Sequence, residues 1–153
     1  MAETAHILTW LDEIRDALVA SSDITAKQVF FMPSDEVPQL GAMPPFYVLV
    51  PHSDEEVDET NGSSLITVAY KLWAYDVLPL QFIAFELLPE NNVVQMLWSA
   101  RGVLHRNLLG HDDTWEKHVS LGTDPAEPAD LENSGGFLVR KARKFQIVFS
   151  HVD

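Results

Sequence analysis

The chain has 153 residues, no cysteine, and ten lysines and arginines against 23 aspartates and glutamates, which gives a formal net charge of −13. This length suits one domain, which we predict over residues 1–153. The absence of cysteine excludes disulfides, thiolate metal sites and thiol nucleophiles. The negative charge argues against nucleic acid as a binding partner, because affinity for DNA comes mostly from neutralised phosphates.

The first predicted element is a helix over residues 5–20. Ile7, Leu11, Ile14 and Leu18 follow the spacing of a single apolar helical stripe. Acidic residues interrupt the apolar run and no basic segment precedes it, so we expect no signal peptide at this end.

Two short apolar runs after the helix predict strands. Lys27–Met32, with the sequence KQVFFM, is stopped by Pro33. Phe46–Val50, with the sequence FYVLV, is a continuous apolar run between two prolines and is typical of a buried central strand. The proline-rich stretch 33–45 between these runs predicts an irregular loop.

A long hairpin is predicted next. Leu65–Val77 is rich in β-forming residues and pairs, in this prediction, with the run Phe46–Val50. The acidic segment 52–64 forms the tip, and Asn61-Gly62 supplies its turn signal. Residues 78–90 lie among prolines and fit either a short strand or a short helix.

The second predicted helix begins after Asn92, a suitable N-cap, and ends before Gly110, a suitable C′ residue. Its apolar stripe consists of Val93, Leu97, Ala100, Leu104 and Leu108. Gly102 inside this helix costs about 1 kcal/mol relative to alanine. A close approach of the helix to the sheet is one explanation for that glycine.

Two strands over residues 114–122 and 137–152 complete the chain, joined by a polar loop over residues 123–136. One face of the final strand carries Phe137, Val139, Phe145, Ile147 and Phe149. Strands outnumber helices and do not alternate with them. We therefore predict an α+β fold, with a mainly antiparallel sheet of four to five strands and two main helices packed on one face.

The chain contains no GxSxG elbow, Walker A sequence or GxGxxG, so we predict no enzymatic activity and no cofactor. His105, His111 and His118 lie close together in the sequence with Asp112 and Asp113. Their spacing matches no zinc-ligand pattern, and we predict no metal site. The longest weakly charged stretch contains prolines and acids, so we also predict no membrane span.

Two clusters of opposite charge are the sharpest features of the sequence. They consist of Arg140, Lys141, Arg143 and Lys144, and of Asp54, Glu55, Glu56, Asp58 and Glu59. Alternation along the final strand places Lys141 and Arg143 on its apolar face, and Arg140 and Lys144 on the other. Two interpretations stay open: charges that protect an exposed edge strand, or a subunit interface in which one subunit's basic cluster meets the next subunit's acidic cluster.

Several segments, taken in chain order, carry a resemblance to a known family. They are the helix ILTWLDEIRDALV, the strand KQVFFM, the pair PPFYVLVP and LITVAYKLWAYDV around the acidic loop, the helix VVQMLWSARGVLHRNLLG and the strand FLVRKARKFQIVFS. In this order they resemble the tail terminator subunits of long-tailed, lambda-like bacteriophages.

The resemblance implies a structural protein of the virion, located in the tail and neck and made in the host cytoplasm. Such a subunit forms a hexameric ring that caps the tail tube and joins it to the head. Its partners would be copies of itself, the tail tube protein and the head–tail connector protein. DNA would be only passing cargo in the channel.

Other functions stay open beside this one. Another neck or tail-completion protein of the virion would have the same composition and differ in its partner. A small cytosolic ligand-binding domain would use a pocket lined by Trp73, Tyr75 and Trp98. A cytosolic adaptor would bind a basic partner through its acidic surface.

Overall fold

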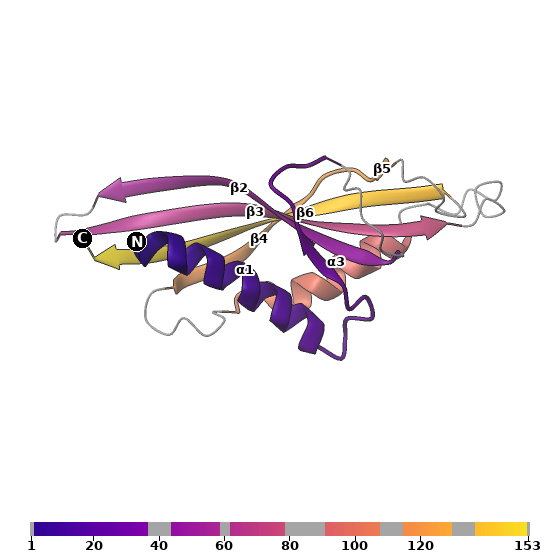
Figure 1. Ribbon diagram of the computed structural model, residues 1–153, viewed down its shortest axis with the longest axis horizontal. Coiled ribbons are helices and arrows are strands. Elements are labelled where there is room, and N and C mark those ends of the chain that lie inside the picture. Colours follow the sequence, from indigo (N-terminus) through magenta and orange to yellow (C-terminus); the bar gives the residue numbers. More distant parts are fainter. Residues whose placement is uncertain are drawn as a thin grey trace.

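The computed structural model describes residues 2–36, 44–58, 62–78, 91–107, 115–129 and 137–152. In these ranges a long, twisted sheet runs the length of the molecule, and the helices α1 (Ala2–Ala20) and α3 (Asn91–Leu104) lie beneath it (Figure 1). The strands are β1 (Val29–Phe31), β2 (Phe46–Asp58), β3 (Ser63–Leu78), β4 (Trp115–Thr123), β5 (Glu127–Pro128) and β6 (Phe137–Val152). They follow the order β1-β2-β3-β6-β4, and β5 pairs with β6 beyond the end of β4.

The predicted fold class, a mainly antiparallel sheet of four to five strands with two main helices packed on one face, is wrong. The described residues form a mixed sheet of six strands, because β1 runs parallel to β2 with Val29 opposite Tyr47. Parallel neighbours need a long connection rather than a tight turn. The stretch between β1 and β2 supplies that length, whereas the sequence showed only a proline-rich loop. The polar loop after β4 also contributes the short strand β5.

The predicted acidic hairpin tip is also wrong. The residues after Pro51 continue β2, with Asp54 opposite Val68 and Glu56 opposite Ile66 on β3. Strand pairing uses the backbone, so charged side chains are accommodated wherever they reach water. A register shift between Pro51 and Ser53 marks the point where the apolar half of β2 gives way to the acidic half.

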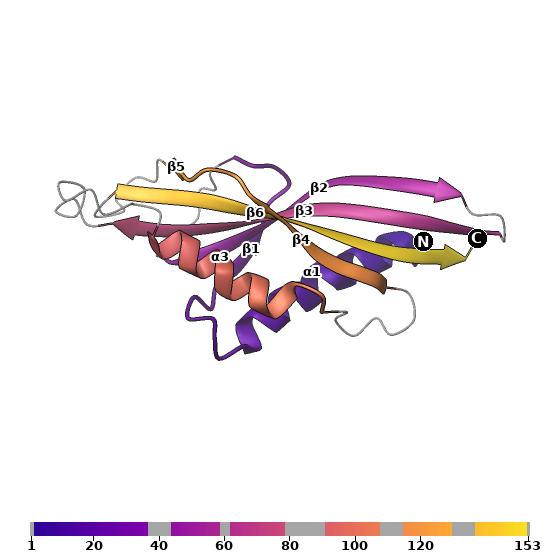
Figure 2. The ribbon, with the colours of Figure 1, turned by 180° about the vertical axis from the view of Figure 1, so that it is seen from behind.

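Figure 2 shows both helices on the same side of the sheet. The larger core consists of side chains from the inner faces of these helices and of the sheet. Ile14 and Leu18 of α1 and Leu97 of α3 are fully buried, as the predicted stripes require, whereas Leu11 of the first stripe is only half-buried. Trp10 was missing from the predicted stripe. It is 2% exposed and packs edge-on against Phe149, with 4.3 Å between ring centroids.

A second core covers the opposite face of the sheet. It consists of Phe46, Val48, Val50, Trp73, Tyr75, Ala129, Leu138 and Ala142, with Phe30 and Met32 packed against it. The segments 32–36 and 124–129 cross this face, so the middle of the sheet is buried on both sides (Figure 1).

The helix α3 ends at Leu104, earlier than predicted from Gly110, which lies outside the described residues. Arg106 takes a left-handed conformation with φ of 62°, and its N–H donates to the carbonyl of His118 at 2.6 Å. Gly102 is exposed, and a Cβ atom built on it would meet nothing within 4 Å. Close packing of the helix on the sheet therefore does not explain this glycine.

Candidate functional site

The basic cluster lies on β6, which is an inner strand and not an edge. β6 pairs with β3 over its whole length and with β4 from Arg143 to Phe149. The interpretation of these charges as guards of an edge strand is therefore wrong. The alternation is as predicted: Arg140 lies over Trp73 in the outer core, whereas Arg143 lies over Trp98 of α3.

Arg140 holds the two crossing segments onto the outer face. Its guanidinium lies 4.0 Å from the centre of the Trp73 ring and donates to the Glu127 carboxylate, with Nε 2.6 Å from Oε1. The same guanidinium donates from Nη1 to the Asp35 carbonyl at 2.6 Å and to the Tyr75 hydroxyl at 3.0 Å. Arg140 is thus committed to contacts within its own chain.

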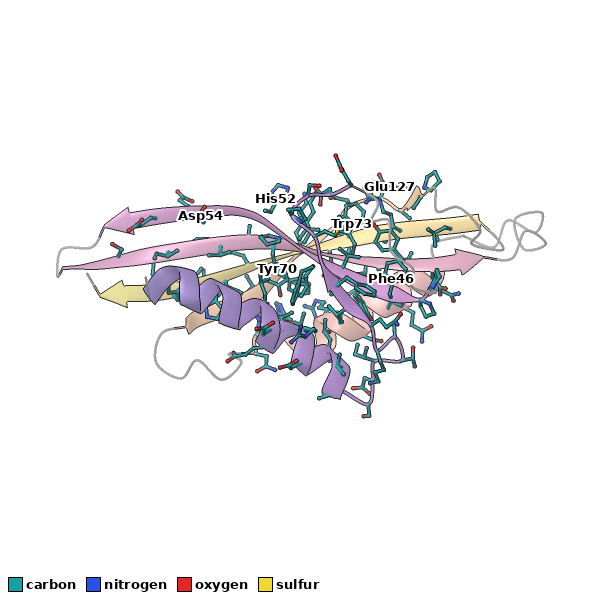
Figure 3. All side chains as sticks on the ribbon, viewed as in Figure 1. Phe46, His52, Asp54, Tyr70, Trp73 and Glu127 are labelled. Carbon is teal, nitrogen blue, oxygen red and sulfur yellow. The ribbon has the colours of Figure 1, made fainter. Side chains whose placement is uncertain are left out.

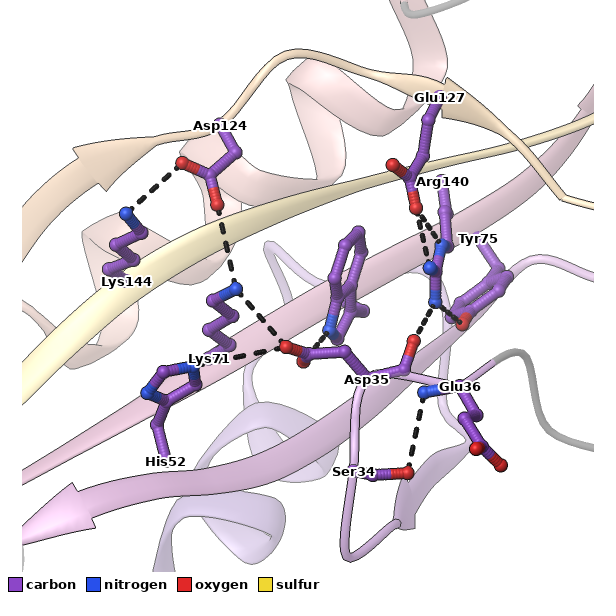
Figure 4. A network of polar contacts seen from close by, with 11 residues as sticks. Ser34, Asp35, Glu36, His52, Lys71, Tyr75, Asp124, Glu127, Arg140 and Lys144 are labelled. Atoms are coloured by element: carbon purple, nitrogen blue, oxygen red, sulfur yellow. Dashed lines mark hydrogen bonds and ion pairs between the residues drawn. The ribbon is translucent and has the colours of Figure 1, made fainter.

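A further group of charges continues from Arg140 across the same face (Figure 4). Lys71 Nζ lies 3.2 Å from the Asp35 carboxylate and 3.7 Å from Asp124, which also pairs with Lys144 at 3.2 Å. The Trp73 indole N–H donates to Asp35 at 2.8 Å. Burial raises the pKa of Asp35, but the hydrogen bonds from Trp73 and Lys71 outweigh burial and leave that pKa lowered.

The charges of this network balance one another. A hollow of about 410 Å³ opens between the crossing segments, lined in part by Asp35, Lys71, Asp124 and Arg140. Its three carboxylates, on Asp35, Asp124 and Glu127, face the three cations of Lys71, Lys144 and Arg140. A balanced network stabilises the crossing segments and offers little net charge to a partner.

The other two residues of the basic cluster border a recess beneath the sheet, which we call the Trp98 recess. It has a volume of about 160 Å³ and is lined by Val94, Leu97, Trp98, Thr123, Lys141 and Arg143. Trp98 is 57% exposed, and the guanidinium carbons of Arg143 and Arg101 lie 4.8 Å and 5.5 Å from its ring centre. No described carboxylate forms an ion pair with Arg101, Lys141 or Arg143.

The acidic cluster lies at the far end of β2. Asp54, Glu55 and Glu56 are all exposed there, and we call these three residues the acidic edge. Figure 3 shows Asp54 on β2, toward the end of the sheet remote from Glu127. β1 covers β2 only from Tyr47 to Leu49, so no described strand pairs with the outer side of the acidic edge.

No described cation pairs with the acidic edge. Two other members of the predicted interface cannot be placed: the side chain of Asp58 and the whole of Glu59 lie outside the described residues. Through β3, Asp54 is in register with Ile147, and the basic cluster lies farther along β6. The fold therefore keeps the two clusters apart within one chain, and a contact between subunits stays a prediction.

Among the histidines, His118 lies in the interior, where none of its surface is exposed. Its Nδ1 lies 3.1 Å from the carbonyl of Asn107, and its Nε2 lies 2.6 Å from the Tyr70 hydroxyl. Because a carbonyl only accepts, Nδ1 carries the proton and Nε2 accepts from Tyr70. Burial lowers the pKa of His118 to about 4, so the ring is neutral at pH 7.

Three histidines, His105, His111 and His118, were considered as metal ligands from the sequence. His105 accepts a hydrogen bond from the Ser120 N–H at 2.9 Å, His118 is engaged in the interior, and His111 lies outside the described residues. In the described ranges, no three His, Asp or Glu side chains are grouped so that they could hold a metal ion.

The aromatic pocket considered from the sequence is not formed. Trp73 and Tyr75 are buried in the outer core, whereas Trp98 is exposed on α3 at the other face. Residues 79–90, which cover most of the ambiguous segment, lie outside the described part of the chain. Neither described helix is long and apolar enough to cross a bilayer.

Two surfaces thus carry charge that the described residues do not neutralise: the Trp98 recess and the acidic edge. The acidic edge could be recognised from the sequence, because its acidic residues are adjacent in the chain. Nothing in the sequence connected Arg101 and Trp98 to the basic cluster, because α3 and β6 meet only in the folded chain. In comparisons with known proteins, no family model matches this chain and no curated protein matches it.

Proposed function

We propose that this protein is a structural subunit that binds copies of itself head to tail and closes into a ring. The acidic edge is the observation that carries this proposal. An unpaired strand edge presents backbone N–H and C=O groups that can bind another chain. Asp54, Glu55 and Glu56 determine which surface can approach this edge, because each is exposed and none has a described cationic partner.

The sign of the charge argues for a head-to-tail contact. Two acidic edges facing each other repel, because like charges opposite one another destabilise strand pairs. Symmetric pairing of this edge with itself is therefore unfavourable. A contact with a cationic surface elsewhere on a second copy is heterologous, and repeated heterologous contacts give a closed ring when the rotation between subunits permits.

Among ring-forming proteins, we propose a tail terminator subunit of a long-tailed bacteriophage. The proposal is supported by the order of α1, β1, the β2–β3 hairpin, α3 and β6, which is the order that carries the resemblance. The ring would have six subunits, cap the tail tube and join it to the head–tail connector in the neck of the virion. A net charge of −13 per subunit favours such a role, because an acidic channel repels DNA and lets it pass.

The test is native mass spectrometry across protein concentration, with negative-stain imaging of the same samples. We expect a closed ring of about six subunits for the unaltered protein. Reversal of the acidic edge, in the variant D54K/E55K/E56K, is expected to leave monomers, because this edge would then repel a cationic surface.

The matched control is D12K/D16K/D23K, which makes the same change in net charge at exposed positions on and just after α1. This control is expected to form rings, and circular dichroism shows that both variants are folded. A protein that stays monomeric at every concentration, at low and at moderate salt, contradicts the proposed function.

A further inference from the structure

The Trp98 recess gathers positive charge in a chain that is otherwise strongly acidic. The guanidinium groups of Arg101 and Arg143 both lie within 5.5 Å of the centre of the Trp98 ring, and Lys141 lines the same recess. Burial lowers the pKa of Arg143, and the neighbouring charge of Arg101 lowers it further. Like charges held together without a counter-charge are unfavourable, which makes the recess a site prepared for an anion.

Arg143 supplies independent evidence for a missing partner. The residue is 5% exposed, and it uses Nη1 to donate to the Ser120 hydroxyl at 2.9 Å. Its Nε is buried and has no hydrogen-bond partner among the described residues. A guanidinium has five N–H donors, and leaving a buried donor unsatisfied costs about 1–3 kcal/mol. An anion seated beside Arg143 would offset part of this cost.

The size and lining of the recess indicate which anion fits. A volume of about 160 Å³ accommodates an acidic side chain rather than a cofactor. Val94, Leu97 and Trp98 supply apolar walls for the methylene groups of such a side chain, and the cations supply the partners for its carboxylate. The ligand chemistry is thus that of an acidic protein segment.

The chain itself carries such a segment, exposed and without a counter-charge. Asp54 and Glu56 stand opposite Val68 and Ile66, which both face the helix side of the sheet. Their side chains therefore point to one face, about 7 Å apart, while Glu55 points to the other. Two carboxylates at this spacing suit cations grouped around a single indole ring.

We infer that the Trp98 recess receives the acidic edge of a second copy, with the carboxylates of Asp54 and Glu56 against Arg101, Lys141 and Arg143. This inference rests on the proposed ring and names its contact. It also corrects the interface predicted from the sequence, because Arg140 and Lys144 are already committed within their own chain.

The first experiment is a charge exchange read by native mass spectrometry. The recess variant R101E/K141E and the edge variant D54K/E56K should each be monomeric, since each leaves like charges facing one another. The chain that carries all four substitutions should form rings again. E55K should keep the ring, because Glu55 lies on the other face. Arg143 is left unaltered, since it is buried and its replacement could unfold the protein.

The second experiment uses a fluorescein-labelled peptide of residues 51–59, PHSDEEVDE, and follows its anisotropy as protein is added at concentrations below ring formation. We expect saturable binding that weakens about tenfold with K141A or R101A. K117A removes a different exposed cation and should leave binding unchanged. A peptide with Asn and Gln at positions 54 and 56 should not bind, and one with Gln at position 55 should.

The outcomes separate the two proposals. Rings that persist in R101E/K141E overturn this inference and leave the proposed function intact. If the protein never forms rings but binds the peptide through Lys141 and Arg101, the proposed function is overturned and the recess remains a binding site for an acidic peptide. Absence of peptide binding together with absence of rings overturns both.

Discussion

Tyr70 and His118 place a hydrogen bond inside the core, where a polar group without a partner is costly. The Tyr70 ring stacks on Phe145 with 5.2 Å between centroids, and its hydroxyl donates to His118 Nε2. Burial raises the pKa of Tyr70 and lowers that of His118 to about 4. Both side chains are therefore neutral, and the pair joins β3 to β4 beside Asn107, which follows the end of α3.

The low pKa of His118 predicts a loss of stability in acid. Its pKa in the folded state is about 4, below the ordinary value of 6.5, so the unfolded chain binds the proton first as the pH falls. The contribution of neutral His118 to the free energy of unfolding is complete above pH 6.5. It is lost as the pH falls from 6.5 to about 4, and the total loss is about 3 kcal/mol.

Urea unfolding at a series of pH values measures this effect. H118Q removes the titrating group and should flatten the dependence over this range relative to the unaltered protein. Equal slopes for H118Q and the unaltered protein would show that His118 does not titrate as its burial requires.

The burial of His118 could not be predicted, although the sequence marked this residue as one of three candidate metal ligands. The sequence presented it as one of three nearby histidines in a polar region. Its burial arises from contacts with Tyr70, which lies 48 residues away in the chain. Local pattern carries no information on such a contact.

At the scale of an element, α3 offers a direct test of helix propensity. Gly102 is exposed in its interior, and an added Cβ would meet nothing within 4 Å. Gly102→Ala should therefore raise the free energy of unfolding by about 1 kcal/mol, because alanine loses less backbone entropy.

Gly122 is the matched contrast in thermal and urea unfolding. A Cβ there also meets nothing within 4 Å, but φ is +105° at the register shift of β4. Gly122→Ala should lower the free energy of unfolding by about 1–3 kcal/mol, since side chains rarely adopt this conformation. If Gly102→Ala destabilised the protein as much, a packing role for that glycine would be restored.

The segments that cross the outer face depend on the geometry of Arg140. Lysine at this position keeps the charge but cannot donate in one plane to Glu127, the Asp35 carbonyl and Tyr75. Arg140→Lys should therefore loosen both segments while the sheet stays folded.

Hydrogen exchange reports this loosening at two amides. Met32 donates to the Leu49 carbonyl at 3.0 Å and Ala129 to that of Leu138 at 2.9 Å, and both amides should exchange on the order of tenfold faster. The Asn107 amide, which donates to Leu104 at the end of α3, is the internal control and should not change. Uniform acceleration of all amides would instead indicate global destabilisation.

At the scale of the whole molecule, the two edges of the sheet are protected by different means. β4 has register shifts at Trp115/Lys117 and at Ser120/Gly122, and such irregularities hinder pairing with another strand. The acidic half of β2 has no register shift between Ser53 and Asp58. The negative charge of the acidic edge is therefore the main feature that prevents this half of β2 from pairing unspecifically with other strands.

Neutralising this edge should promote aggregation. D54N/E55Q/E56Q removes three negative charges from the open strand, so its backbone becomes accessible to other copies. We expect faster thioflavin T-positive aggregation than for the unaltered protein. D12N/D16N/D23N changes the net charge equally at exposed sites outside the sheet and should aggregate no faster. Equal acceleration in both variants would assign the effect to net charge alone.

The sequence by itself determined the local features of this protein. The helical stripe containing Ile14 and Leu18 and the alternation of Arg140 with Lys141 along β6 follow from the periods of the helix and the strand, which any chain with this pattern shares. The separation of acidic from basic residues was also visible in the sequence, because residues of each charge are grouped along the chain.

Only the tertiary structure decided which strands pair and which charges find partners. The parallel contact of β1 with β2, the bond from Arg140 to Asp35 across 105 residues, and the meeting of Trp98 with Arg143 each join segments far apart in sequence. Such contacts depend on the free energy of the whole packed chain rather than on local propensity. That packing commits Arg140 to contacts within its own chain and leaves Lys141 beside the Trp98 recess.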